Sequence, residues 1–377
     1  MSAETKKLMT PIKVGALELK HRVVLPPMSR LRAQWPSAVP GDLLFDYYTQ
    51  RASDGGLMIS EANAVSPEAR PYHTGPGLYT EEQVASWRRI TDAVHAKGAF
   101  FFAQISHAGR ATSEVLTGQQ PVSASVDETF WTDESIVVST AEGFKSPSPH
   151  RALDADGIRA IVAQYRRAAE HAKRAGFDGV EILGGNGHIV EQFLQNRSNK
   201  RTDEYGGSHE NRVRFLTEIL DAVVDVWGAD RVGVRISPSS VFSHMGDDNP
   251  RELYRHVAER LNGFGLAYLH VIEPRISGAD TVAEGEPPVA AAELSQVFRG
   301  PVIAAGGFTP KTAEAGLTAG VSDLVAFGRY FSSNPDLVRR IAEDLPLTPY
   351  DRSTFYAFDA KGYTDFPAYD ASKAVAA

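Results

Sequence analysis

The chain has 377 residues, 42% of them hydrophobic and 23% charged, and a formal net charge of −8, a composition typical of a globular protein without a basic face for nucleic acid. It contains no cysteine, which excludes a disulfide framework, a thiolate nucleophile, an iron–sulfur cluster and a cysteine-ligated zinc site. Any redox chemistry must therefore come from a bound cofactor or from a metal held by other residues.

Short apolar runs alternate with helical patterns along nearly the whole chain. The runs predict eight strands, at Arg22–Leu25, Leu57–Glu61, Phe100–Ile105, Gly179–Leu183, Val232–Ser237, Tyr268–Ile272, Val302–Ala305 and Leu324–Phe327. Helical stretches between them include Val84–Ala96, Gly157–Ala175, Glu210–Trp227 and Glu252–Phe264. Strands that alternate with helices indicate a parallel sheet. Eight such units fit a closed (β/α)8 TIM barrel better than an open doubly wound sheet, so we predict a single α/β barrel domain over residues 1–377.

Three segments fall outside this repeat. Ile12–Lys20 contains a turn and predicts a hairpin under the barrel. Ala108–Arg151 is rich in Ser, Thr and Pro and predicts an excursion above the barrel, such as a short hairpin or lid. The tail from Pro346 carries many aromatic residues, which argues against disorder. We expect it to pack on the body or to border the site.

The ends of the last two predicted strands favour a phosphate site. Small residues follow both strands, at Gly306, Gly307 and Gly328, and Arg329 adds a positive charge. Exposed backbone N–H groups and a following helix favour a phosphate at this end of a barrel. A pair of tight turns that need glycine for backbone reasons is the alternative.

Polar residues at the ends of three other strands suggest a site for a flat heterocycle. Ser29, Gln104 and Arg235 follow or end the first, third and fifth predicted strands. A glutamine offers donors and an acceptor to a pyrimidine edge, and an arginine stabilises negative charge on a reduced ring. Each of them alone would more simply be a structural residue of the barrel rim.

Several long motifs resemble the Old Yellow Enzyme family of FMN-dependent ene-reductases, over nearly the full chain. The most specific are QFLQNRSNKRTDEYGGSHEN at Gln192–Asn211 and AFGRYFSSNPDL within Asp323–Leu337. Further similarity lies in Leu17–Arg30, Tyr47–Glu61, His107–Arg110 and Ser353–Pro367. The family fold is a TIM barrel with FMN at the carboxyl ends of its strands, in agreement with the prediction above.

The resemblance implies a cofactor site and a reaction. FMN would contact Pro27, Met28, Ser29, Ala62, Gln104 and Arg235, and its phosphate would lie at Gly306, Gly307, Gly328 and Arg329. The Ser29 hydroxyl would donate to flavin O4. NADPH or NADH would reduce FMN, which would pass a hydride to an activated C=C bond of an enone, maleimide, nitroalkene or related compound, and a proton would follow.

The sequence departs from the family where the substrate is activated. Relatives use a pair of donors, His with His or His with Asn, and commonly a Tyr two residues later that supplies the proton. Here these positions hold Leu183, Asn186 and His188. Leucine cannot donate a hydrogen bond, and loss of one such donor typically costs about 2.7–4 kcal/mol in the transition state. We take Asn186 and His188 as the candidate catalytic residues, with His188 delivering the proton, polarising the carbonyl or neither.

The substrate cavity should be wide and aromatic. Ser106 stands where many relatives have Trp, and Tyr72 and Tyr356 match positions where aromatic residues line the substrate side. Leu183 completes this candidate substrate-binding set. His107 is expected to support its loop, with no part in the chemistry.

Other functions compete with ene reduction. With one donor missing, the chain could be a double-bond isomerase, a dehydrogenase, or a flavoprotein with weakened ene-reductase activity. The histidines are scattered, so we expect no metal. Met1–Met9 lacks the apolar core of a secretory signal, and no apolar run approaches the ~18 residues that span a bilayer. We therefore expect a cytoplasmic monomer or homodimer that binds a small molecule, with neither nucleic acid nor membrane as a partner.

Overall fold

A closed parallel barrel forms the body of the computed structural model, which describes residues 6–277, 280–281 and 289–374. Within these residues eight strands follow one another around the barrel: β3 (Val23–Leu25), β4 (Leu57–Ile59), β6 (Phe100–Ser106), β11 (Gly179–Gly184), β12 (Val232–Ile236), β13 (Tyr268–Ile272), β16 (Val302–Ala305) and β17 (Leu324–Ala326). β17 pairs with β3 and β6 pairs with β11, both in parallel, which closes the ring. The predicted TIM barrel and all eight predicted strand positions are confirmed.

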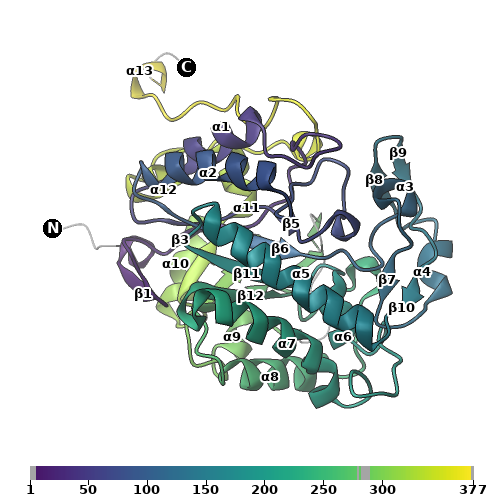
Figure 1. Cartoon of the computed structure of the whole chain (residues 1–377). Helices are drawn as coiled ribbons and strands as arrows, with labels where there is room; N and C mark the ends of the chain where they lie inside the picture. Colours follow the sequence, from purple (N-terminus) through teal and green to yellow (C-terminus); the bar gives the residue numbers. More distant parts are fainter. Residues whose placement is uncertain (1–5, 278–279, 282–288, 375–377) are drawn as a thin grey trace.

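Helices cover the outside of the barrel (Figure 1). The long ones are α2 (Glu81–His95), α5 (Ala155–Arg174), α7 (His209–Trp227) and α8 (Pro250–Leu261), and shorter ones are α1 (Asp42–Arg51), α9 (Ala291–Leu294) and α10 (Pro310–Thr318). A side chain caps the first turn of each long helix, from Thr80, Asp154, Ser208 and Asn249 respectively, which satisfies backbone N–H groups that have no partner in the helix. None of the helices in the described residues is both long and apolar enough to cross a bilayer.

The apolar core has two parts, one between strands and helices and one inside the barrel. The hairpin of β1 (Ile12–Val14) and β2 (Leu17–Leu19) closes the inner part from below, with Val14, Leu17 and Leu19 buried in it. At its turn, Gly15 has φ +55° and lies against the Asp230 carbonyl. The hairpin predicted under the barrel is therefore confirmed.

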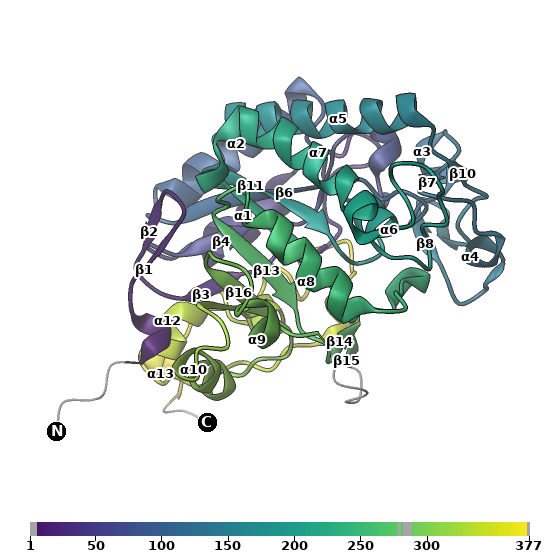
Figure 2. The same ribbon diagram turned by 90° about the horizontal axis from the view of Figure 1, so that it is seen from below.

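The segment between β6 and α5 forms the predicted excursion. It contains α3 (Glu114–Thr117), β7 (Val122–Ser123), α4 (Glu128–Thr132), β8 (Val138–Thr140), β9 (Gly143–Lys145) and β10 (Arg151–Ala152). We call it the lid segment. β8 and β9 pair as an antiparallel hairpin, and two views place the lid segment at the end of the barrel opposite β1 and β2 (Figures 1 and 2).

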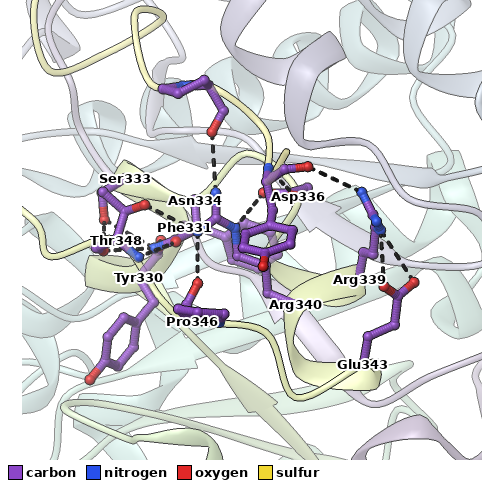
Figure 3. Close-up of polar contacts among 12 residues, drawn as sticks. Tyr330, Phe331, Ser333, Asn334, Asp336, Arg339, Arg340, Glu343, Pro346 and Thr348 are labelled. Atoms are coloured by element: carbon purple, nitrogen blue, oxygen red, sulfur yellow. Dashed lines mark hydrogen bonds and ion pairs between the residues drawn. The ribbon is translucent and has the colours of Figure 1, made fainter. Parts of the chain in front are cut away.

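The carboxyl-terminal tail packs on the body, as predicted. Beside α11 (Gly328–Ser333) and α12 (Leu337–Ala342), Asn334 exchanges two hydrogen bonds with the backbone of Thr348 at 2.7 and 3.0 Å (Figure 3). Arg340 donates to the carbonyls of Pro346 and Pro367, at 2.8 and 3.2 Å. These bonds fix both ends of the tail against the same two helices.

The middle of the tail is fixed by aromatic packing. Tyr363 is fully buried and stacks on Tyr47, with ring centroids 4.2 Å apart. Arg51 lies over the other ring of this stack and donates to the Tyr363 carbonyl at 2.9 Å. Such cation–π contacts strengthen when they are shielded from water, so the aromatic residues of the tail hold it in place.

Candidate active site

A layer of polar side chains lies inside the barrel, above its apolar interior. Side chains on one face of a strand recur every second residue, and the strand register puts Gln104 beside Glu181 and Arg235 beside His270. Four neighbouring strands thus contribute one residue each. Glu181 and His270 are fully buried, and Gln104 is 2% exposed. We call these four residues the polar layer.

Glu181 is the centre of the polar layer. Its Oε1 accepts a hydrogen bond from Gln104 Nε2 at 2.7 Å, and its Oε2 lies 2.8 Å from His270 Nδ1. Burial lowers the pKa of His270, so the neutral imidazole donates from Nδ1. A carboxylate oxygen accepts such a bond, and the amide nitrogen of a glutamine can only donate. Glu181 therefore turns the Gln104 amide so that its carbonyl oxygen is left for a ring N–H.

Arg235 supplies the positive charge of the polar layer. It is partly exposed, its Nη1 donates to the Pro27 carbonyl at 3.3 Å, and its buried Nε has no hydrogen-bond partner among the described residues. Burial lowers the pKa of Arg235, and the nearby Glu181 opposes that shift. The unpaired N–H is a donor without an acceptor of its own in the protein, as expected where a ligand supplies the acceptor.

The turn after β16 is made of two glycines with backbone angles that favour glycine. Gly306 has φ +137° and Gly307 has φ +63°, and a Cβ on Gly306 would lie 2.9 Å from Ile276. Side chains other than glycine are strained at these angles. The two glycines predicted as a phosphate site therefore form a turn that suits only glycine, with Gly306 partly buried and Gly307 exposed.

Arg275 is a residue at this turn that the sequence analysis missed. Its Nε donates to the Gly306 carbonyl at 2.6 Å, its guanidinium lies 4.5 Å from the centre of the Phe308 ring, and its Nη2 is buried without a partner in the described chain. It lies three residues past the end of β13. A search for arginines just past the end of each predicted strand would have found Arg275.

The neighbouring strand ends bring the other predicted cofactor residues to the same rim. Gly328 starts α11 directly after β17, and a Cβ there would meet Met28 at 3.1 Å. Arg329 follows, 6.0 Å from the centre of the Tyr350 ring. Met28 and Ser29 after β3 are partly buried. Ala62, after the adjacent β4, is 7% exposed, so the predicted cofactor residues converge on one end of the barrel.

The candidate substrate donors lie on the turn after β11. Leu183 is only 2% exposed and is paired in register with Arg235. Asn186 has φ +55°, a left-handed conformation that is uncommon for a residue with a side chain. The Asn186 amide makes no hydrogen bond to the side chains or backbone of the described residues, since only its backbone N–H is bonded, to Ser237 Oγ at 2.9 Å. It is the first side chain past the strand that can donate to a ligand.

His188 and His107 are buried together at the ends of β11 and β6. They are 5% and 1% exposed, and desolvation lowers the pKa of His188 to about 4 and that of His107 to about 3. His188 Nδ1 has no hydrogen-bond partner among the described residues. His107 Nδ1 accepts from the Gly109 N–H at 2.9 Å, which fits the predicted role of supporting its loop. His188 is therefore a neutral imidazole.

Two tyrosines approach each other at the mouth of the barrel. Tyr72 is partly buried, Tyr356 of the tail is 47% exposed, and the two lie close enough for Tyr356 to raise the pKa of Tyr72 beyond the effect of burial. The backbone of Tyr72 forms a β-bridge to Ser139 of the lid segment. Ser106 is fully buried at the end of β6. Tail, lid segment and barrel thus meet around the candidate substrate residues.

Comparison with known proteins identifies the family. The model of the NADH:flavin oxidoreductase / NADH oxidase family matches residues 7–348. The chain is 46% identical over 367 residues to 12-oxophytodienoate reductase 1 of Oryza sativa subsp. japonica, covering 96% of this chain and 92% of that protein. The chain belongs to the NADH:flavin oxidoreductase / NADH oxidase family.

Solved structures agree with this assignment. Morphinone reductase superposes with a TM-score of 0.89 at 42% identity, covering 99% of both chains. An old yellow enzyme homologue from Zymomonas mobilis superposes with a TM-score of 0.90 at 36% identity, covering 96% of this chain and 100% of that one. The resemblance to the Old Yellow Enzyme family is confirmed. This flavin oxidoreductase uses FMN and NAD(P)H and belongs to the enzymes that reduce activated C=C bonds.

The residues present in this flavin oxidoreductase fit FMN. Arg235 Nε has no hydrogen-bond partner among the described residues, the Gln104 amide nitrogen is bonded to Glu181, and a glycine turn such as that at Gly306 and Gly307 suits a phosphate. Sequence reasoning missed Glu181 and His270, which orient Gln104 from below. A charged residue in the middle of an apolar strand, as in Gly179–Gly184, was the available signal.

Proposed function

We propose that this flavin oxidoreductase reduces bulky electron-poor alkenes, such as cyclic enones, maleimides and nitroalkenes, with Asn186 as its principal substrate donor. The observation that carries the proposal is the turn after β11, where Asn186 is partly exposed with φ +55° and Leu183 is buried at the position that the resemblance assigns to the other donor. Tyr72, Tyr356, Ser106 and Leu183 are proposed to line the substrate cavity.

The polar layer and the glycine turns are proposed to hold the cofactor. Gln104 and Arg235 would contact the ring, Ser29 would donate to O4, and Pro27, Met28 and Ala62 would pack beside it. Gly306, Gly307, Gly328 and Arg329 would hold the phosphate. When bound there, FMN would supply hydride transfer between NAD(P)H and the β-carbon of the alkene.

Asn186 and His188 are proposed to act on the substrate. The Asn186 amide donates to the activating carbonyl or nitro oxygen, which stabilises the negative charge that develops there. His188 is neutral at ordinary pH because burial lowers its pKa to about 4. It can therefore donate a hydrogen bond from an imidazole N–H, but it holds no extra proton to deliver. We propose that His188 supports substrate binding and that the α-carbon proton comes from solvent.

Anaerobic stopped-flow tests the proposed reaction. The enzyme is reduced with NADPH and then mixed with 2-cyclohexenone, N-methylmaleimide and a nitroalkene. We expect reoxidation of the reduced flavin by all three acceptors, fastest with the nitroalkene and the maleimide, which need the least help from donors. Reduced flavin that persists with every acceptor would refute the proposal.

Isomerisation is the second candidate, because the buried Leu183 leaves the donor pair incomplete. Deuterated nicotinamide distinguishes the two reactions. Reduction places one deuterium at the β-carbon and consumes one nicotinamide per product. Isomerisation moves a double bond with no net consumption of nicotinamide.

The domain organisation, the oligomeric state and the cellular location of the enzyme stay predictions. We propose that the whole chain works as one FMN-binding domain, as a monomer or homodimer in the cytoplasm. Sedimentation of the holoenzyme measures the oligomeric state, and fractionation of the source cells measures the location.

A further inference from the structure

A fully buried carboxylate lies directly behind the turn that carries Asn186. Glu191 is on α6 (Ile189–Leu194) and none of its surface is exposed. Its Oε2 accepts a hydrogen bond from the Gly187 N–H at 2.6 Å, and its Oε1 accepts from Ser237 Oγ at 2.6 Å. The donors that reach it are neutral groups, which makes burial of this charge costly.

The hydrogen bonds of Glu191 reach Asn186 through one intermediate. The Ser237 hydroxyl donates its hydrogen bond to Glu191, so its Oγ can accept one from the Asn186 N–H at 2.9 Å. Glu191 thereby holds the N–H groups of two successive residues, Gly187 directly and Asn186 through Ser237. Both residues have positive φ, +55° for Asn186 and +75° for Gly187.

The left-handed conformation of Asn186 needs such support. Asparagine adopts this conformation more readily than most residues with a side chain, but it keeps one such conformation only where its surroundings fix it. The turn is also tightly packed, because a Cβ on Gly185 would lie 2.7 Å from Ser237 Oγ. Without the carboxylate, the turn would relax and the Asn186 amide would leave its place at the barrel mouth.

We propose that Glu191 is a positioning residue for substrate binding, which acts through Ser237 and Gly187 to aim the Asn186 amide at the activating oxygen of the substrate. This rests on the proposed donor role of Asn186. Burial raises the pKa of Glu191 to about 7, and the hydrogen bonds from Ser237 and Gly187 oppose that shift.

Tyr254 provides a matched control. Its hydroxyl contacts the same Glu191 Oε1 at 3.4 Å and is equally buried, but it lies on α8, away from the Asn186 turn. A variant at Tyr254 therefore disturbs the same carboxylate and leaves its bonds to Ser237 and Gly187 intact. A general loss of packing would affect both kinds of variant alike.

The test is a double-mutant cycle with the holoenzyme, read by ligand binding. The probe is 4-hydroxybenzaldehyde, whose phenolate oxygen requires donors, and its Kd is measured by absorbance titration of the oxidised flavin. We expect Glu191→Gln and Ser237→Ala each to raise the Kd about tenfold, as loss of one well-placed hydrogen bond would. In an Asn186→Ala background each should change the Kd less than about twofold, because coupled residues are not additive. Tyr254→Phe should leave the Kd within about twofold of wild type.

The outcomes separate this inference from the proposed function. Equal effects of Glu191→Gln with and without Asn186 would overturn the positioning role. An unchanged Kd in Asn186→Ala alone would overturn the donor role of Asn186 and the inference with it. If Glu191→Gln does not fold with FMN bound, Ser237→Ala carries the same cycle by itself.

Discussion

Leu183 is the residue that separates this site most clearly from the two-donor arrangement implied by the resemblance. It occupies a buried position next to Arg235 in the strand register. A leucine there contributes apolar contact and no hydrogen bond. The activating oxygen of a substrate thus depends on donors further along the turn, and the rate with weakly activated acceptors should suffer most.

Restoring the donor at this position should restore the rate. We expect 2-cyclohexenone to reoxidise the reduced flavin of Leu183→His about ten- to hundredfold faster than that of wild type, because an oxyanion-type donor typically contributes a factor of ~10²–10³ to the rate. Stopped-flow absorbance of the flavin measures the rate, and Leu183→Met controls for the change of side-chain shape. Equal rates in the His and Met variants would contradict the missing-donor explanation.

His188 should not affect the pH dependence of flavin reoxidation near pH 6.5, the ordinary pKa of a histidine. Burial lowers its pKa from 6.5 to about 4, so it stays neutral between pH 5.5 and pH 8. We expect the second-order rate constant for flavin reoxidation to have no limb near pH 6.5 in wild type. His188→Tyr should have the same flat profile. A limb near pH 6.5 that disappears in His188→Tyr would show that His188 titrates during turnover.

At the scale of elements, the alternation of strands and helices predicted the barrel, whereas the positions of single residues in the sequence could not predict the polar layer. Alternating strands and helices were enough for the barrel, because each unit is local in sequence. The polar layer was not predicted as a network, because Glu181 lies 77 residues from Gln104 and 89 residues from His270. Only the closed register brings them together. Glu191 on α6 escaped prediction for a similar reason, since its partner Ser237 lies 46 residues away, just past the end of β12.

The hairpin below the barrel should be sensitive to its single turn glycine. A Cβ on Gly15 would lie 2.0 Å from the Asp230 carbonyl oxygen, and its φ is +55°. We expect Gly15→Ala to lower the free energy of unfolding by about 2–4 kcal/mol, from the strained φ and the clash together. Urea unfolding of the holoenzyme measures this loss.

A variant at Gly118 separates the effect of the strained φ from the effect of the clash. Its φ is +72°, and a Cβ there would meet nothing within 4 Å. Gly118→Ala should therefore cost only the strained φ, about 1 kcal/mol. If both variants lose the same free energy, the hairpin turn is not tightly packed against the barrel floor.

At the scale of the whole molecule, the two ends of the barrel have different tasks. The hairpin of β1 and β2 lies at one end, opposite the lid segment (Figure 2), and it packs apolar side chains into the barrel interior, whereas the polar layer carries titratable groups. Burial of these groups has a global consequence, because a pKa that differs between the folded and unfolded chain makes stability depend on pH. Histidines and glutamates contribute with opposite signs.

Four buried histidines destabilise the fold in acid. Their pKa values are lowered by burial to about 3 for His107 and about 4 for His21, His150 and His188. The unfolded chain takes up protons first, near pH 6.5. The stability that these groups contribute is therefore complete above pH 6.5 and is lost as the pH falls toward 4.

Two buried glutamates act in the opposite direction. Burial raises the pKa of Glu61 and Glu191 from 4.5 to about 7. The folded chain holds protons that the unfolded chain has released, so their contribution is complete below pH 4.5 and is lost as the pH rises toward 7.

The six groups together predict a stability maximum near pH 6.5. Between pH 4.5 and 6.5 the histidines outnumber the glutamates, so the free energy of unfolding should rise with pH, by up to roughly 3 kcal/mol per pH unit for two net protons. Urea unfolding of the holoenzyme at several pH values measures the slope. His21→Asn should reduce this slope by the contribution of one proton, roughly 1.4 kcal/mol per pH unit. A flat profile from pH 4.5 to 6.5 would show that these histidines are not held neutral by burial.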